Sequence, residues 1–184
     1  RRMRPPAHAP AVKPGETFAK TIQLTPAMVA NFSKAAGDNN PLHFDPAHAA
    51  TTRFKRVIAS GTQTASYLMA LTAEHFSALG AVVGLEFNIR FKRPVFADET
   101  IAVEWEVVSV EWSSRMGGDI VELRGCVRNE DGGVAVAGKG RVLLCGTCMN
   151  ARGMTDEDAM EGAARSTMDE LAAATASADK LLVF

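Results

Sequence analysis

The chain has 184 residues, 47% of them hydrophobic and 22% charged, with 20 basic against 21 acidic side chains. This length fits one domain with a sizeable core, and the charge balance argues against disorder and against a nucleic-acid partner. Because no apolar run approaches the roughly 20 residues that span a bilayer, and residues 1–15 lack the apolar stretch of a secretory signal, we expect a cytoplasmic protein with no membrane partner.

Residues 1–14 hold three arginines, four prolines and no acid, which predicts a flexible N-terminal arm. A mitochondrial presequence would look similar, but it should also be rich in serine and amphipathic, so it is the second interpretation. Residues 16–24 predict a first strand. Thr25 followed by Pro26 is typical of a helix start, and Gly37 is typical of a helix end.

Asp45, which precedes a proline, predicts the start of a second, short helix and is best explained as its cap. A longer helix is expected from Gly61 to about Leu79, and its nearly uniform apolarity predicts that it is buried. Strict alternation of apolar and polar residues then predicts four antiparallel strands, interpreted as a meander, over residues 83–92, 100–112, 119–129 and 133–145.

One buried helix ahead of a twisted antiparallel sheet predicts an α+β fold in which the sheet curls around the helix. The edges of such a half-wrapped sheet usually pair with a second copy, which favours a homodimer. We therefore assign residues 15–146 to one domain. The Ala-rich residues 147–184 predict a helical C-terminal appendage capped at Thr155, with a disordered segment as the alternative.

The three cysteines are too few for a disulfide framework, which fits a reducing compartment. Cys145 and Cys148 form a CxxC, but no second pair of ligands follows it. A redox CxxC should also open a helix, whereas this one closes an apolar strand. We therefore expect no metal and no redox cofactor.

The stretch AAGDNNPLHFD, residues 35–45, has to turn the chain between two helices. Because the turn is tight, Asp38 and His43 can lean into the same space. A carboxylate beside an imidazole can hold one water, deprotonate it for attack and return a proton to the product, as hydration of a double bond requires. The pattern also fits a structural interpretation, in which Asp38 caps backbone amides and His43 is a satisfied, partly buried histidine.

The same stretch spells G-D-x-N-P-x-H-x-D, which resembles the signature of the MaoC-like, (R)-specific enoyl-CoA hydratases. The long helix and the later segment FNIRFKRPVFADETIAVEWEVVS resemble that family in the same order, over about residues 15–145. The resemblance implies the hot-dog fold, a long central helix wrapped by a curved antiparallel sheet. Neither tail is covered by it.

Carried over by position, the resemblance makes Asp38 and His43 the catalytic pair that activates water, with Asn40 orienting the water or the pair. Gly61 would open the long helix and point its backbone N–H at the thioester oxygen. The flanking Ser60 and Thr62 are candidate substrate-binding residues, and either could also cap the helix.

Ser60 departs from the family pattern, because many members place a histidine immediately before the glycine. The acyl-chain preference of those members therefore cannot be transferred to this chain. The cluster Arg90, Lys92 and Arg93 could meet coenzyme A phosphates or could be an ordinary solvated strand face. His75 sits in a helical run without an acid at the right spacing, and no role is expected for it.

These observations together predict reversible hydration of a trans-2-enoyl thioester to a 3-hydroxyacyl thioester, with an acyl-CoA or acyl-carrier thioester as substrate. A hot-dog acyl-CoA thioesterase is one alternative, since it would hydrolyse the bond that Gly61 polarises. A non-catalytic acyl-thioester-binding subunit is another. The arrangement of Asp38, Asn40 and His43 favours hydration, and a homodimer or higher homo-oligomer is the expected assembly.

Overall fold

The computed structural model describes residues 10–144, and within them no helix is long and apolar enough to cross a membrane. Its elements, in chain order, are β1 (Thr17–Gln23), α1 (Pro26–Ala35), the 3-10 turn η1 (Pro41–His43), α2 (Pro46–Thr51), α3 (Gly61–Ser77), β2 (Val82–Phe91), β3 (Thr100–Ser113), β4 (Gly118–Arg128) and β5 (Val134–Leu144). The expected C-terminal appendage and the CxxC lie outside the described residues.

The helix boundaries follow from the capping residues. The Thr25 side chain accepts a hydrogen bond from the Met28 N–H at 3.2 Å and so starts α1. The Asp45 carboxylate accepts the N–H groups of Ala47 and His48 at 2.9 and 3.1 Å and so starts α2. Gly37 follows α1 with a φ of 73°, a left-handed conformation that favours glycine. These predicted caps are confirmed.

The five strands form one antiparallel sheet in the order β1-β3-β4-β5-β2. The predicted meander of four strands is therefore wrong in one respect, since only β3, β4 and β5 are consecutive neighbours. β2 pairs with β5 instead of β3, with Phe87 opposite Gly140. Alternation identifies a strand and its buried face, but it does not say which strand lies beside it.

The segment between β2 and β3 explains this arrangement, because it crosses the end of the sheet instead of forming a hairpin. It runs beside the residues that precede α3: the Ala59 N–H donates to the Val95 carbonyl at 2.8 Å and the Ala97 N–H to the Val57 carbonyl at 3.1 Å. The crossing segment therefore holds the start of α3 in place.

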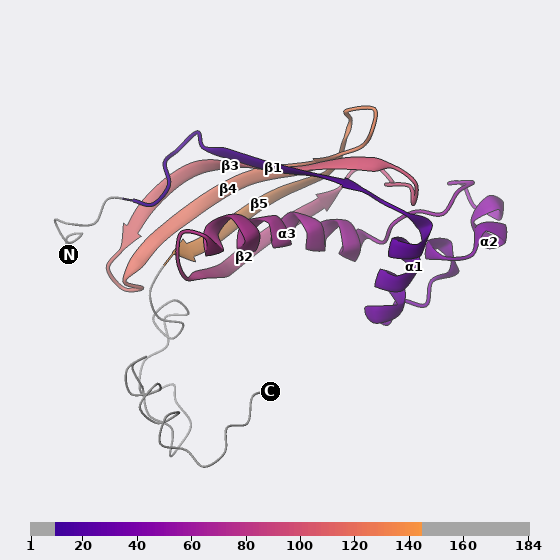
Figure 1. The fold of residues 1–184 in the computed structure, drawn as a ribbon, viewed down its shortest axis with the longest axis horizontal. Helices are drawn as coiled ribbons and strands as arrows, with labels where there is room; N and C mark the ends of the chain where they lie inside the picture. Colours follow the sequence, from indigo (N-terminus) through magenta and orange to yellow (C-terminus); the bar gives the residue numbers. More distant parts are fainter. Residues whose placement is uncertain (1–9, 145–184) are drawn as a thin grey trace, which may run out of the picture.

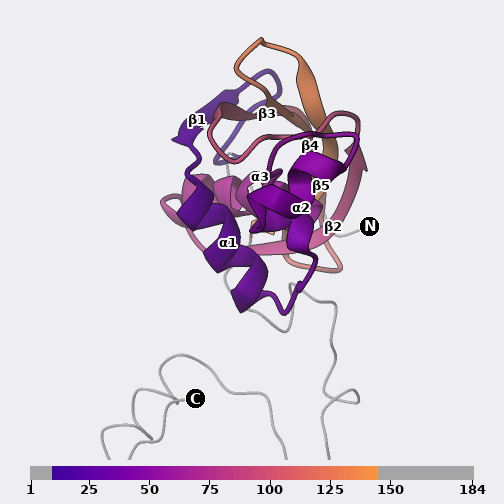
Figure 2. The ribbon, with the colours of Figure 1, turned by 90° about the vertical axis from the view of Figure 1, so that its right-hand side faces the viewer.

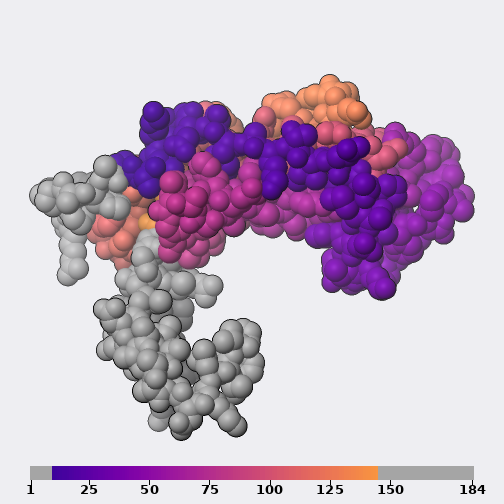
Figure 3. All heavy atoms as spheres, viewed as in Figure 1, coloured from indigo at the N-terminus to yellow at the C-terminus, as the bar shows by residue number. Residues whose placement is uncertain are grey.

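The sheet curves over α3, which lies along its concave face (Figure 1). Leu68 and Phe76 of α3 are fully buried, and Trp105 of β3 is 1% exposed. The Trp105 indole Nε1–H donates to the Leu68 carbonyl at 2.7 Å, which ties the helix to the middle of the sheet. Part of α3 is visible at the surface in the space-filling view (Figure 3). Ala73 and Glu74 of this helix are exposed. The hot-dog fold is thus confirmed.

Two features differ from the sequence interpretation. Val12, expected within a flexible arm, is 3% exposed and packs in the hydrophobic core. His75, for which no acid partner was expected, has its Nε2 atom 3.1 Å from Glu16 Oε1 and its ring stacked on Phe18. The sequence hid this partner because Glu16 comes from the segment before β1, far away along the chain.

Candidate active site

The predicted catalytic stretch lies at the end of the sheet where α3 begins, and α1 and α2 flank it (Figure 2). Its turn is held by backbone contacts. The Asp38 N–H donates to the Ser33 carbonyl at 2.8 Å, and the Asn40 N–H donates to Asp38 Oδ1 at 3.0 Å. The Asn40 side chain accepts the Leu42 N–H at 3.1 Å and caps η1. Asn40 therefore contacts the predicted pair through its backbone.

His43 is 7% exposed at the end of η1, and its ring is held by a backbone carbonyl on the side away from Asp38. Its Nδ1 atom lies 2.8 Å from the Ile58 carbonyl oxygen. A carbonyl oxygen only accepts hydrogen bonds, so Nδ1 carries a proton and donates. In the neutral ring, Nε2 is then an acceptor, and it is the atom that faces Asp38.

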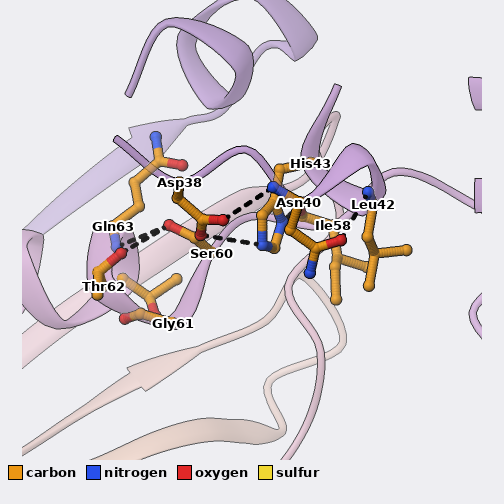
Figure 4. A network of polar contacts seen from close by, with 10 residues as sticks. Asp38, Asn40, Leu42, His43, Ile58, Ser60, Gly61, Thr62 and Gln63 are labelled. Carbon is orange, nitrogen blue, oxygen red and sulfur yellow. Dashed lines mark hydrogen bonds and ion pairs between the residues drawn. The ribbon is translucent and has the colours of Figure 1, made fainter. Parts of the chain in front are cut away.

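The Asp38 Oδ2 atom lies 3.4 Å from His43 Nε2, with the carboxylate 34% and the imidazole 9% exposed (Figure 4). An ionised carboxylate and a neutral Nε2 are both acceptors, so a proton donor has to stand between them or beside them. A water donating to both atoms meets this need, and so does a proton on either group. The geometry confirms that the turn brings Asp38 and His43 together, and this arrangement can hold and transfer a proton.

Gly61 begins α3, and Ser60 is the cap of that helix. Ser60 is 2% exposed, and its hydroxyl accepts the Gln63 N–H at 3.2 Å and lies 3.0 Å from the Thr62 hydroxyl. Neither the Gly61 N–H nor the Thr62 N–H has an acceptor among the described residues, as is usual in the first turn of a helix. These groups lie at the positive end of a helix of 17 residues. They can therefore receive a developing negative charge.

A hollow of about 310 Å³ opens beside Gly61. Its wall includes Ile58, Thr64 and the ring of Phe91, which is 58% exposed. A Cβ atom on Gly61 would lie 3.1 Å from that ring, so the glycine lets the ring approach the helix start. Neither Asp38 nor His43 lines this hollow. Ile58 connects the hollow to the pair, since it lines the hollow and its carbonyl oxygen holds His43.

Two contributors to the site were missed by the sequence interpretation. The Ile58 carbonyl fixes the protonation of His43, and no sequence signal indicates it because any residue has a carbonyl. Phe91 stands over Gly61, and its position at the end of the alternating strand 83–92 was an available signal. Over residues 10–144, no group of three or more His, Cys, Asp or Glu side chains is placed to hold a metal ion.

Comparison with known families gives two matches. The model of the MaoC like domain matches residues 9–121, which is more than half of the chain and includes Asp38, His43 and Gly61. The model of the DsrE/DsrF-like family matches residues 134–184. That second match covers less than a third of the chain, and its only described part is β5, which is an integral strand of the sheet.

Individual proteins agree with the first match. The chain is 32% identical over 136 residues to an (R)-specific enoyl-CoA hydratase of Aeromonas caviae, covering 74% of this chain and 98% of that protein. It is 30% identical over 96 residues to 3-hydroxyacyl-thioester dehydratase X of Mycobacterium tuberculosis, covering 52% of this chain and 31% of that protein. The solved (R)-hydratase from A. caviae superposes with a TM-score of 0.68 at 31% identity, over 74% of this chain and 100% of that one.

Proposed function

The chain belongs to the MaoC-like domain family, and on this premise we propose that it is a hydro-lyase that interconverts a trans-2-enoyl thioester and a 3-hydroxyacyl thioester. The observation that carries the proposal is the approach of Asp38 Oδ2 to His43 Nε2 at 3.4 Å, with both atoms available as acceptors. The names of the A. caviae and M. tuberculosis relatives support the same reaction class.

In the proposed mechanism, the pair binds one water by accepting its two hydrogen bonds. The pair takes one proton from this water as the water oxygen bonds to C3 of the enoyl group. A proton held by the pair is then returned to C2, so that one water adds across the double bond and both side chains end unchanged. The hydrogen bond from Nδ1 to the Ile58 carbonyl keeps Nε2 directed at the water throughout.

Addition at C3 pushes electrons toward the thioester oxygen, so the enolate-like charge needs a partner. We propose the Gly61 N–H for this role, because it lacks another acceptor in the described structure and lies at the N-terminus of α3. The thioester would then occupy the hollow beside Gly61, with its double bond directed past this residue toward Asp38. No metal or redox cofactor enters the proposed reaction.

Two alternatives remain distinct from this proposal. A thioesterase would use the same Gly61 N–H to polarise the thioester, and a binding subunit would use the hollow without chemistry. The discriminating experiment incubates the full chain with a panel of trans-2-enoyl-CoA substrates and follows two signals separately. We expect loss of the conjugated thioester absorbance without release of free thiol. Thiol release would instead identify a thioesterase, and no change in either signal would identify a binding subunit.

We also propose that the functional unit is a homodimer, because β2 is an edge strand whose outer side has no partner among the described residues. β2 leads directly to Phe91 and the hollow, so a second copy paired there would enclose the proposed thioester site. In sedimentation equilibrium at micromolar concentration, the expected mass is twice that of one chain or a larger multiple. A single-chain mass over the whole concentration range would contradict the dimer.

A further inference from the structure

The face of the sheet that points away from α3 carries an excess of positive charge over β2, β5 and β4. A shallow hollow of about 510 Å³ on this convex face is lined by five cations, against the two acids Glu86 and Glu122. We call these five side chains the cationic face: Arg90, Lys92, Arg124, Lys139 and Arg141. This excess is local, because the whole chain has a formal net charge of −1.

Part of the cationic face is neutralised within the sheet, and part of it is not. Arg124 pairs with Glu106 at 2.9 Å, and Arg141 pairs with Glu122 at 3.0 Å. Arg90, Lys92 and Lys139 form no ion pair or side-chain hydrogen bond with any residue between 10 and 144. These three cations are exposed, and they are therefore available to an external anion.

The pairing register makes this arrangement costly. Lys139 of β5 lies directly opposite Arg124 of β4, and like charges opposite each other destabilise an antiparallel pair. Between the cations, the floor of the hollow consists of small residues, Gly125, Ala137, Gly138 and Gly140. An acid in place of Lys139 would face Arg124 and the neutral Asn88 and would relieve this repulsion, so the lysine at this position supports an anionic ligand.

The cationic face is continuous with the proposed thioester site. Lys92 lines the hollow on the convex face and also the hollow beside Gly61. Arg53 extends the positive charge around the second hollow, and Arg93, which pairs with Asp131 at 3.4 Å, also lines it. A partner bound on the cationic face would therefore stand next to the entrance through which a thioester reaches Gly61.

The shape of the face indicates what kind of anion it binds. Small-molecule sites are mostly apolar with a few placed polar groups, whereas this hollow is lined by five cations and two acids. It spans three strands, or about 10 Å from β2 to β4. Two copies of the chain would not pack through it, because their cations would meet. Such a surface suits electrostatic docking of an acidic protein.

We propose that the cationic face docks an acidic carrier protein, which presents the enoyl thioester to the hollow beside Gly61 on its phosphopantetheine arm. This inference rests on the proposed function and names the physiological form of its substrate. The carrier's acidic surface would contact Arg90 and Lys139, while the arm would pass Lys92. Coenzyme A thioesters would still react, because they need only the arm and the hollow.

The test compares crotonyl-CoA with a crotonyl group loaded on a purified, acidic acyl-carrier protein. In the full chain, the double variant Arg90→Glu/Lys139→Glu is expected to lower kcat/KM for the crotonyl-carrier substrate by about tenfold or more, because rim charges chiefly affect association. The kcat/KM of this double variant for crotonyl-CoA should stay within about twofold of the wild-type value. Lys92 is left unchanged because it also lines the hollow beside Gly61.

The matched control is Lys13→Glu/Arg115→Glu, which makes the same charge change at exposed positions outside the cationic face. It should leave both substrates unaffected, and a thermal melt of each double variant checks its folding. An equal loss on both substrates would assign the face to coenzyme A phosphates and overturn the carrier proposal, as would no loss on either. If the wild type hydrates crotonyl-CoA but not the carrier substrate, the inference fails while the proposed function stands.

Discussion

Asp38→Asn and His43→Gln are each expected to lower the turnover of crotonyl-CoA by about 10² to 10⁴, the usual contribution of general acid–base groups. The physical reason is the facing arrangement of Asp38 Oδ2 and His43 Nε2, which gives one water two acceptors. An amide oxygen in place of either group can still accept a hydrogen bond, but it is too weak a base to take a proton from the water. The measurement is the initial rate of chromophore loss for each variant.

Because the two side chains act on one water, their effects should be strongly non-additive. The double variant should therefore be hardly slower than either single one. The matched control is His48→Gln in α2, an exposed histidine five residues beyond His43, which should keep wild-type turnover. Near wild-type rates in both single variants would contradict the mechanism. A fall in melting temperature that accounts for the lost activity would instead support a structural role for the turn.

Trp105→Ala is expected to cost about 3 to 5 kcal/mol of folding free energy, as large aromatic truncations in a core do. Trp105 is 1% exposed, and its ring lies over Gly125 of the adjacent strand β4 and over Gly138 and Gly140 of β5, the next strand beyond it. Removal of the indole would leave a cavity between α3 and the sheet and would also remove the hydrogen bond to the Leu68 carbonyl. Urea denaturation followed by circular dichroism measures the loss.

Trp105→Phe separates the two contributions, because it keeps most of the ring and removes the Nε1–H donor. Loss of this one buried hydrogen bond should cost about 1 kcal/mol, beyond a smaller packing term. Leu79→Ala is the surface control: the side chain is 48% exposed, and its truncation should change stability by no more than about 0.5 kcal/mol. A loss below about 1 kcal/mol for Trp105→Ala would show that the ring does not hold α3 to the sheet.

Much of the fold follows from local signals in the sequence. The caps Thr25 and Asp45 and the left-handed Gly37 depend only on neighbouring residues, so they could be placed correctly without tertiary information. The same holds for the long helix from Gly61 and for the alternating strands. The proximity of Asp38 and His43 was also predictable, since a tight turn leaves two residues of the same loop little room to separate.

The remaining features depend on contacts between distant segments. The placement of β2 beside β5 follows from the crossing segment that pairs Val95 with Ala59, which no periodicity reveals. The acid partner of His75 is likewise distant along the chain, since it is Glu16, which precedes β1. The glycines under Trp105 were visible as interruptions in otherwise regular strands, a pattern that marks close approach of another group. The sequence did not show which ring approaches them.

The central claim is that Asp38 and His43 add one water across the double bond of an enoyl thioester. The most direct measurement incubates the full chain with crotonyl-CoA in oxygen-18-labelled water and analyses the products by mass spectrometry. We predict one labelled oxygen in a 3-hydroxybutyryl group that is still joined to coenzyme A, and we expect Asp38→Asn to form this product about 10² to 10⁴ times more slowly. A labelled free carboxylate together with free coenzyme A, or unlabelled crotonyl-CoA after prolonged incubation, would contradict the account.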